Sequence, residues 1–448
     1  MKESRYNIWV SRDGAHFVYN GMSGALLRLS PDDYQHLQEF LSGKTEADCR
    51  PQLLSDLIVG RMVINDGTDE LAMLESTYRA SRLNPDTLSL TLVTSLGCNF
   101  DCPYCFEAKH PSIMSQEVEA ALLELLDDRA PEIKRLNVTW FGGEPLVGKQ
   151  SLLRLSDAFI ERCDRRSIGY SARITTNGYL LDEEICVALR DRRVSGVQIS
   201  LDGPPEVHDR MRPLADGRGT FWKIIENLHH AVKYFGVSLR INVDKENLDL
   251  AEELLRILER ENFAGKLQPY LGQLVSSGAG DAPSKSSGHC FLTNREFALA
   301  EHKFNELAFR YGFGSNRLPK PVGAPCTAVR QNELVVGSNG ELYKCYLSIG
   351  DKLEVIGDIR NFREQNGRAQ KWLLYDPFSN SECRQCMALP VCMGGCAHHA
   401  MDPIQYENRC GTFRHNHEER VARFVDIAET RSSKGLISSH QLSQPTTC

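Results

Sequence analysis

The sequence predicts an α/β protein with a parallel sheet at its centre. Between residues 88 and 275, apolar runs typical of buried strands alternate with amphipathic helical stretches. We expect strands at 88–95, 136–141, 170–176, 197–201, 238–243 and 267–275, and helices near 115–129, 150–164, 182–193, 220–235 and 248–262. This alternation favours right-handed βαβ units. Such sheets place their chemistry at the carboxyl ends of the strands, so the residues that follow each strand are the functional candidates.

Length and composition narrow the possible classes of protein. The chain has 448 residues, which is enough for two or three domains, and its 41% apolar and 25% charged residues are typical of a folded soluble protein. With a net charge of −7 and no basic run, nucleic acid is not an expected partner. No signal peptide pattern and no apolar stretch of about 20 residues is present, so we expect no membrane partner and a cytoplasmic location.

The first 86 residues form a predicted module of their own. Two short strand-like runs, YNIWV and HFVYN, are separated by an Asp-Gly pair that is typical of a hairpin. Helical stretches follow at 31–42, 50–60 and 69–82. Two interpretations stay open: a solvated cap on the next domain, or a winged-helix-like module that offers a strand edge to an extended peptide.

The part that follows the sixth strand has a different character. A Gly/Ser-rich stretch at 276–288 predicts a loop, a helix is expected near 294–311, and the tail beyond about 433 is polar. We therefore divide the chain into a module at 1–86, an α/β domain at 87–290, a cysteine-rich domain at 291–432 and a tail at 433–448.

Cysteine is the unusual component of the chain. Ten of the fifteen cysteines fall into two groups: Cys98, Cys102 and Cys105, and then Cys326, Cys345, Cys383, Cys386, Cys392, Cys396 and Cys410. In the absence of a secretion signal, ligation of metals or clusters is a better interpretation than a disulfide framework, because the cytosol keeps thiols reduced. The other five cysteines show no spacing typical of metal or cluster ligands, and they are expected to be ordinary thiols.

The first group directly follows the first predicted strand, in TSLGCNFDCPYCFE. Three thiolates with no obvious fourth suit a cubane cluster with one open iron, whereas structural zinc sites use four ligands. This stretch resembles the CxxxCxΦC loop of the radical S-adenosylmethionine (SAM) family, with Tyr104 at the aromatic position Φ. The resemblance implies a 4Fe–4S cluster that chelates SAM and delivers the electron that cleaves its C–S bond, which yields a 5′-deoxyadenosyl radical. A structural zinc site is the alternative.

Two further motifs follow the second and fourth predicted strands. Phe141 is followed by Gly-Gly-Glu-Pro, and Ser200 begins Ser-Leu-Asp-Gly-Pro, with Arg212 further along. The resemblance implies that Gly142, Gly143 and Glu144 contact the amino group of SAM, and that Ser200 and Arg212 hold its ribose and carboxylate. We also expect Asn242, on the fifth strand, near SAM. Each of these residues alone is also common in helix caps and turns.

The second cysteine group is similar to the SPASM pattern of radical SAM enzymes at all seven positions. The resemblance implies two auxiliary 4Fe–4S clusters, so three clusters in all. Cys383, Cys386, Cys392 and Cys410 would bind the outer cluster, and Cys326, Cys345 and Cys396 would supply three ligands to the inner one. The remaining inner iron has no cysteine ligand in this pattern, and its ligand stays open between a substrate thiol on one side and water, a side chain or Cys290 on the other.

The resemblance thus implies a partial (β/α)6 TIM-like radical SAM barrel with an N-terminal winged-helix-like module and a C-terminal SPASM domain. The expected function is maturation of a ribosomally made precursor peptide: its leader binds the module, a hydrogen is abstracted, and a thioether or C–C cross-link forms. A low-potential donor such as flavodoxin or ferredoxin would supply electrons.

Two other functions stay open. The first is oxidation of Ser or Cys to formylglycine in sulfatases, which Tyr346 disfavours because sulfatase-maturing relatives carry aspartate after the cysteine equivalent to Cys345. The second is a non-catalytic iron–sulfur or zinc protein. His398 and His399 are interpreted as solvated surface residues.

Overall fold

A mixed sheet runs through the molecule in the strand order β11-β10-β9-β8-β7-β6-β12-β13-β14. The computed structural model describes residues 1–42, 50–107, 110–275, 290–314 and 317–433. The predicted loop at 276–288 and the tail beyond 433 lie outside these ranges.

The parallel part of the sheet confirms the predicted α/β fold. Its strands are β6 (Thr87–Ser95), β7 (Arg135–Gly142), β8 (Gly169–Thr176), β9 (Val194–Ser200), β10 (Gly236–Val243) and β11 (Leu267–Gln273). Neighbours in the chain are neighbours in the sheet, and all these pairs are parallel. The arrangement does not close on itself, because β6 pairs with β12 on its other side.

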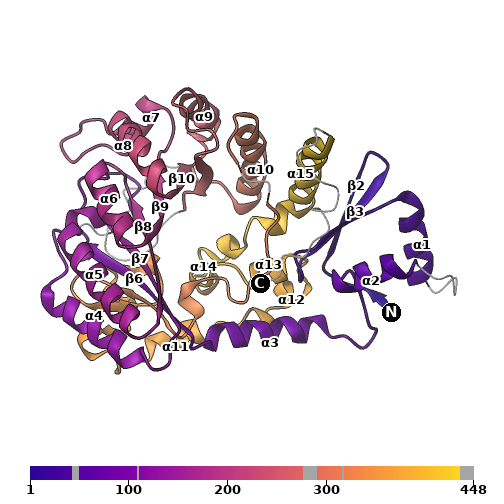
Figure 1. Cartoon of the computed structure of the whole chain (residues 1–448), viewed down its shortest axis with the longest axis horizontal. Helices are drawn as coiled ribbons and strands as arrows, with labels where there is room; N and C mark the ends of the chain where they lie inside the picture. The colour runs from indigo at the N-terminus through magenta and orange to yellow at the C-terminus, as the bar shows by residue number, and fades with distance from the viewer. Residues whose placement is uncertain (43–49, 108–109, 276–289, 315–316, 434–448) are drawn as a thin grey trace.

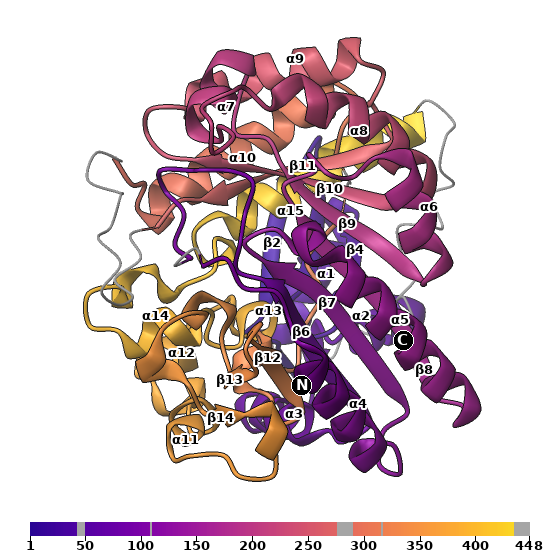
Figure 2. The same ribbon diagram turned by 90° about the vertical axis from the view of Figure 1, so that its left-hand side faces the viewer.

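Helices cover the outer face of these strands (Figures 1 and 2). They are α4 (Gln116–Arg129), α5 (Lys149–Arg165), α6 (Glu183–Asp191), α8 (Phe221–Tyr234) and α9 (Ala251–Arg260), close to the predicted ranges. A short helix, α7 (Pro205–Met211), was not predicted, because two turns are too few to show an apolar period. Helix α9 begins three residues later than predicted, since Leu248–Leu250 form a 3-10 turn.

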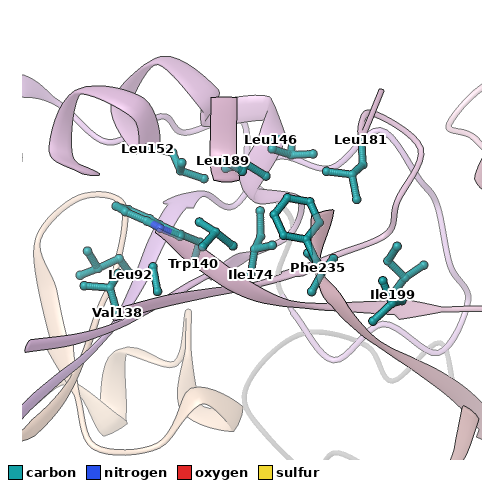
Figure 3. Close-up of a cluster of buried hydrophobic side chains, with 14 of the residues drawn as sticks. Leu92, Val138, Trp140, Leu146, Leu152, Ile174, Leu181, Leu189, Ile199 and Phe235 are labelled. Carbon is teal, nitrogen blue, oxygen red and sulfur yellow. The ribbon is translucent and has the colours of Figure 1, made fainter. Parts of the chain in front are cut away.

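The main core lies between the sheet and this helical layer. Alternate strand residues such as Val138, Trp140 and Ile174 are buried and meet Leu152 and Leu189 of the helices (Figure 3). The intervening residues of the strands face the other side of the sheet, where Thr and other polar side chains line a cavity. The alternation therefore gives the sheet one apolar face for packing and one polar face for function.

The N-terminal module contains a three-stranded antiparallel sheet of β2 (Asn7–Arg12), β3 (Ala15–Asn20) and β4 (Leu26–Leu29). The predicted hairpin is confirmed: Asp13 and Gly14 both have positive φ, as a two-residue type I′ turn requires. Helices α1 (Pro31–Leu41), α2 (Pro51–Val59) and α3 (Glu70–Leu83) follow, and the short strands β1 (Lys2–Glu3) and β5 (Val63–Ile64) pair with each other. Strand β4 was not predicted.

This module packs against the C-terminal region of the chain (Figure 1). Ile8 and Phe17 share a core with Phe413 and Val421 of α15 (Phe413–Ser433). Tyr6 is fully buried in a second core with Leu389, beside the cysteine-rich segment.

The cysteine-rich region continues the central sheet. Strand β12 (Glu333–Val336) is parallel to β6, and β13 (Glu341–Tyr343) and β14 (Gly357–Asp358) extend the sheet in antiparallel fashion. Helix α10 (Asn294–Arg310) and the short helices α11 (Arg368–Leu373), α12 (Ser381–Gln385), α13 (Leu389–Cys392) and α14 (Ala397–Met401) complete it. Among the described helices, none is long and apolar enough to cross a bilayer.

Candidate active site

A cavity of about 420 Å³ opens at the carboxyl ends of the parallel strands. This volume lies in the range of small-molecule sites. The cavity brings together most of the residues expected from the sequence, namely Cys98, Cys102, Tyr104, Cys105, Gly142, Gly143, Ser200, Arg212 and Asn242. The cysteine-rich region supplies part of the wall through Tyr346, Leu347, His398, His399, Asp402 and Gln405. The site is therefore shared between two regions that lie far apart in the sequence.

The loop that carries the first three cysteines is fastened by its backbone. Asp101 N–H donates to Pro213 O at 2.9 Å, and Ala215 N–H donates to Asn99 O at 3.0 Å. The Cys98 sulfur accepts from the Phe100 N–H at 3.4 Å. Cys102 is buried, and Cys98 and Cys105 are partly buried. Soft thiolates held on one loop at the edge of a cavity are a suitable donor set for an iron–sulfur cluster.

Gly142 and Gly143 allow the end of β7 to lie directly against the chain that leads into this loop. A Cβ at Gly142 would lie 2.3 Å from Ser95 O, and one at Gly143 would lie 2.7 Å from Leu96 O. Gly142 also has φ of +129°. The two glycines are required for this close approach, and their backbone faces the cavity.

The Glu144 carboxylate is turned into the protein. It is fully buried and accepts hydrogen bonds from Thr176 Oγ1 at 2.7 Å, Asn177 N–H at 2.7 Å and Leu146 N–H at 3.0 Å. Burial raises its pKa, and these hydrogen bonds oppose the shift. Gly142 and Gly143 line the cavity, whereas the Glu144 carboxylate points away from it and joins the ends of β7 and β8.

A buried polar network connects the cysteine loop with the ends of β9 and β10. Asp202 is fully buried and accepts from the Asn242 N–H and from Asn242 Nδ2, both at 3.0 Å. The Tyr104 hydroxyl donates to Asp202 and accepts from Arg212 Nη1 at 2.5 Å. Arg212 lies 3.5 Å from Asp202, which compensates its charge. Asp202 was not among the predicted site residues, although the motif Ser-Leu-Asp-Gly contains it.

Two side chains near this network are available to a ligand. Arg212 lines the cavity, and its Nε is buried without a hydrogen-bond partner. Ser200 also lines the cavity and is 8% exposed. A buried guanidinium N–H without an acceptor is costly and fits an anionic ligand group such as the carboxylate of SAM.

His208 supports the network from behind in one defined tautomer. Its Nδ1 accepts from the Asp202 N–H at 3.1 Å. Its Nε2 therefore carries the proton and donates to Thr220 Oγ1 at 3.0 Å, while the Thr220 hydroxyl donates to Arg212 O. Burial, and secondarily the charge of Arg212, hold the pKa of His208 well below its usual value. The imidazole is accordingly neutral.

Cys383 and Cys345 both lie near other thiols of the second cysteine group. Burial raises the pKa of Cys383 to about 11, and the nearby thiols of Cys392, Cys410 and Cys386 contribute. Burial likewise raises the pKa of Cys345 to about 12, with contributions from Cys396 and Cys326. Cys383 and Cys345 thus each have other thiols of this group as near neighbours. Arg414 Nη1 donates to Cys410 Sγ at 3.1 Å.

The interpretation of His398 and His399 as surface residues is wrong. Both line the cavity, and His399 is only 9% exposed, with Nδ1 3.1 Å from Asn408 O. The sequence carried no signal for this, because the position depends on how α14 packs against the barrel. Tyr346 lines the same wall, whereas Cys290 is exposed and lies outside the cavity wall.

No group of three or more His, Cys, Asp or Glu side chains in the described ranges is spaced to hold a single metal ion. A cubane cluster contains four irons, so its thiolates need not converge on one point. The donor chemistry, the glycine contacts and the unpaired Nε of Arg212 together fit a cluster with SAM beside it.

Residues 92–258 match the radical SAM superfamily. A cysteine-type anaerobic sulfatase-maturating enzyme of Clostridium novyi is 23% identical over 373 residues, which cover 75% of this chain and 96% of that protein. A serine-type anaerobic sulfatase-maturating enzyme of Bacteroides thetaiotaomicron is 28% identical over 145 residues, or 31% of this chain and 34% of the relative.

Solved structures share the fold. Native anSMEcpe with bound AdoMet and the Cp18Cys peptide superposes with a TM-score of 0.58 at 20% identity, over 77% of this chain and 100% of that one. Streptococcus suis SuiB bound to its precursor peptide SuiA gives a TM-score of 0.52 at 13% identity, over 92% of this chain and 99% of SuiB. A match over 92% of 448 residues includes much of residues 1–86, whereas one over 77% can omit them entirely.

Proposed function

The chain is a radical SAM enzyme, and we propose that it matures a ribosomally made precursor peptide by installing a thioether or C–C cross-link. One observation carries this proposal: the cavity wall combines the cysteine loop of the radical SAM domain with Tyr346, His398 and His399 of the cysteine-rich region. A substrate side chain in this cavity would lie between the two. The match to the radical SAM superfamily supports an enzyme over the alternative of a non-catalytic iron–sulfur or zinc protein.

The proposed cofactors are SAM and three 4Fe–4S clusters. Cys98, Cys102 and Cys105 would hold the SAM-binding cluster, and the two thiol sets of the cysteine-rich region would hold the auxiliary clusters. When bound, the cluster held by Cys98, Cys102 and Cys105 would, together with SAM, supply the radical chemistry for removing a hydrogen from carbon. The chain's own residues would orient the reactants: Arg212 and Ser200 toward the carboxylate and ribose of SAM, with Tyr104 held between Asp202 and Arg212.

The relatives support a peptide substrate. The structure of anSMEcpe contains the bound Cp18Cys peptide, and the structure of SuiB contains its bound precursor peptide SuiA. The longer match with SuiB favours a leader-binding role for residues 1–86, because it extends into the N-terminal module. We propose that this winged-helix-like module binds the leader, and that a flavodoxin or ferredoxin donates electrons.

Sulfatase-type formation of formylglycine is the second candidate, and the sulfatase-maturating relatives favour it. Tyr346 speaks against it: this residue lines the cavity and directly follows Cys345. The resemblance to sulfatase-maturing enzymes would imply an aspartate at this position. A phenol has an ordinary pKa near 10 and is a weak proton acceptor at neutral pH.

Anaerobic co-expression with a short peptide encoded beside the gene tests the proposal. We expect tandem mass spectrometry to show the loss of two hydrogens, localised to a linked pair of residues and dependent on the leader. A variant with alanine at Cys98, Cys102 and Cys105 is the control and is expected to give no product. Oxidation of a free sulfatase-motif peptide without any leader would replace cross-linking with the second candidate.

A further inference from the structure

Arg240 is a second arginine in the cavity, and the site described above does not use it. It lies on β10 and lines the cavity together with Asn242 and Tyr346. Its Nε donates to Asn242 Oδ1 at 2.7 Å. Asn242 belongs to the network expected around SAM, whereas Tyr346 belongs to the wall made by the cysteine-rich region. Arg240 therefore lies between the two places that a substrate would connect.

The direction of the side chain is fixed by a neighbouring glycine. Arg240 pairs with Tyr270 of β11, but its guanidinium lies over Gly272, two residues further toward the carboxyl end of the strand. A Cβ at Gly272 would lie 2.4 Å from Arg240 Nε and 2.8 Å from its Cζ. Any other residue at 272 would displace the guanidinium. The absence of a side chain there lets the charged group lean toward the active end of the barrel.

The charge of Arg240 has no carboxylate partner among the described residues. Arg212, the other arginine of the cavity, is compensated by Asp202 at 3.5 Å. Arg240 makes no ion pair within the described ranges, and its hydrogen bond to Asn242 is to a neutral amide. The side chain is half-buried, so bulk water screens it only in part. A half-buried, uncompensated guanidinium favours an anion, and the flat guanidinium fork matches a carboxylate.

We propose that the Arg240 guanidinium binds a carboxylate of the substrate: an Asp or Glu side chain, or the C-terminal carboxylate, next to the residue that is modified. This inference rests on the proposed function, because it names the chemistry that the peptide must present. SAM also contains a carboxylate, but Arg212 offers it an unpaired buried Nε. Two arginines thus serve two carboxylates, and Arg240 sets the register of the peptide in the cavity.

The test uses two small probes and the full-length protein, reconstituted anaerobically with its clusters and saturated with SAM. The probes are N-acetyl-aspartic acid N-methylamide and N-acetyl-asparagine N-methylamide, which differ only in the carboxylate. We expect ligand-observed NMR titrations to show about tenfold tighter binding of the acid, since charged hydrogen bonds in partly dry sites are worth about this factor. Arg240→Gln is expected to abolish the preference, and Arg240→Lys to retain part of it.

Matched variants distinguish a binding role from a structural one. Arg173→Gln on β8 removes an exposed arginine outside the cavity wall and is expected to leave the tenfold preference intact. Gly272→Ala keeps the charge of Arg240 but displaces its guanidinium, so we expect a weaker preference for the acid probe. This variant tests the inference independently, should Arg240→Gln fail to fold.

Several results would overturn the inference. One is equal affinity of the wild-type protein for the two probes, and another is a preference that survives Arg240→Gln. A tenfold loss of SAM affinity in Arg240→Gln, measured by calorimetry, with the probe preference unchanged, would assign Arg240 to the carboxylate of SAM instead. Because the probes do not depend on any precursor peptide, a failed co-expression with an intact probe preference would contradict only the proposed function.

Discussion

Asp202 is the residue on which the geometry of the SAM side of the cavity depends. A fully buried carboxylate is costly unless it is paired and hydrogen-bonded, and here Asn242, Tyr104 and Arg212 meet this requirement. Because Asp202 holds Tyr104 and Arg212 at once, the loop with the three cysteines is linked to the end of β9. The neutral imidazole of His208 completes this arrangement through the Asp202 N–H.

The protonation of His208 leads to a prediction on stability. Its pKa in the folded protein is well below the value near 6.5 of an unfolded histidine. The contribution of this site to the free energy of unfolding is therefore fully present above pH 6.5. Below pH 6.5 it falls by up to about 1.4 kcal/mol per pH unit. Urea unfolding at pH 7.5 and 5.5 should show a smaller pH effect for His208→Gln than for the wild type. An equal change in the free energy of unfolding between the two pH values in both proteins would contradict the assignment of a neutral His208.

At the scale of elements, the ends of β6 and β7 approach each other more closely than side chains permit. The Gly143 N–H donates to Ser95 O at 3.1 Å, and the Glu144 N–H donates to Gly97 O at 3.0 Å. These bonds place the second strand end against the base of the cysteine loop. The shape of that loop therefore depends on a neighbouring strand as well as on its own sequence.

Gly143→Ala tests this dependence. The new Cβ would lie 2.7 Å from Leu96 O, so the backbone before Cys98 must move. We expect the SAM-binding cluster to be lost or altered, seen as a weaker or changed SAM-dependent electron paramagnetic resonance signal. Gly169→Ala is the matched control, because its Cβ would meet no atom closer than 3.6 Å. An unchanged signal in Gly143→Ala would show that the close approach does not shape the loop.

At the scale of the whole molecule, three regions of the chain share their cores. The N-terminal sheet packs on α15, and α3 is fastened to the cysteine-rich region by Tyr78, whose hydroxyl donates to Tyr375 O at 2.8 Å. Strand β12 joins that region to the barrel through β6. The module at residues 1–86 is thus an integral layer of the fold, and the cores that it shares also contain Cys383 and Cys386.

Removal of residues 1–86 is expected to damage the cysteine-rich region as well as any peptide binding. The truncation would expose Phe413, Val421 and Leu389, which are buried against the module. Large exposed apolar patches promote association, so we expect aggregation on size-exclusion chromatography and a reduced iron content. A monomeric truncated protein with full iron content would show instead that the module is a separable cap.

The sequence by itself determined the parallel α/β fold, the hairpin of Asp13 and Gly14, and the cysteines with their spacing. These features depend on short-range patterns: alternation along a strand, the turn preference of Asp-Gly, and ligands held on one loop. Only the tertiary structure decided that His398, His399 and Tyr346 face the cavity, that β12 pairs with β6, that Glu144 turns inward and that Arg240 lies over Gly272. The physical reason is that these contacts join residues far apart in the chain or on different strands, where packing and not local pattern selects the neighbour.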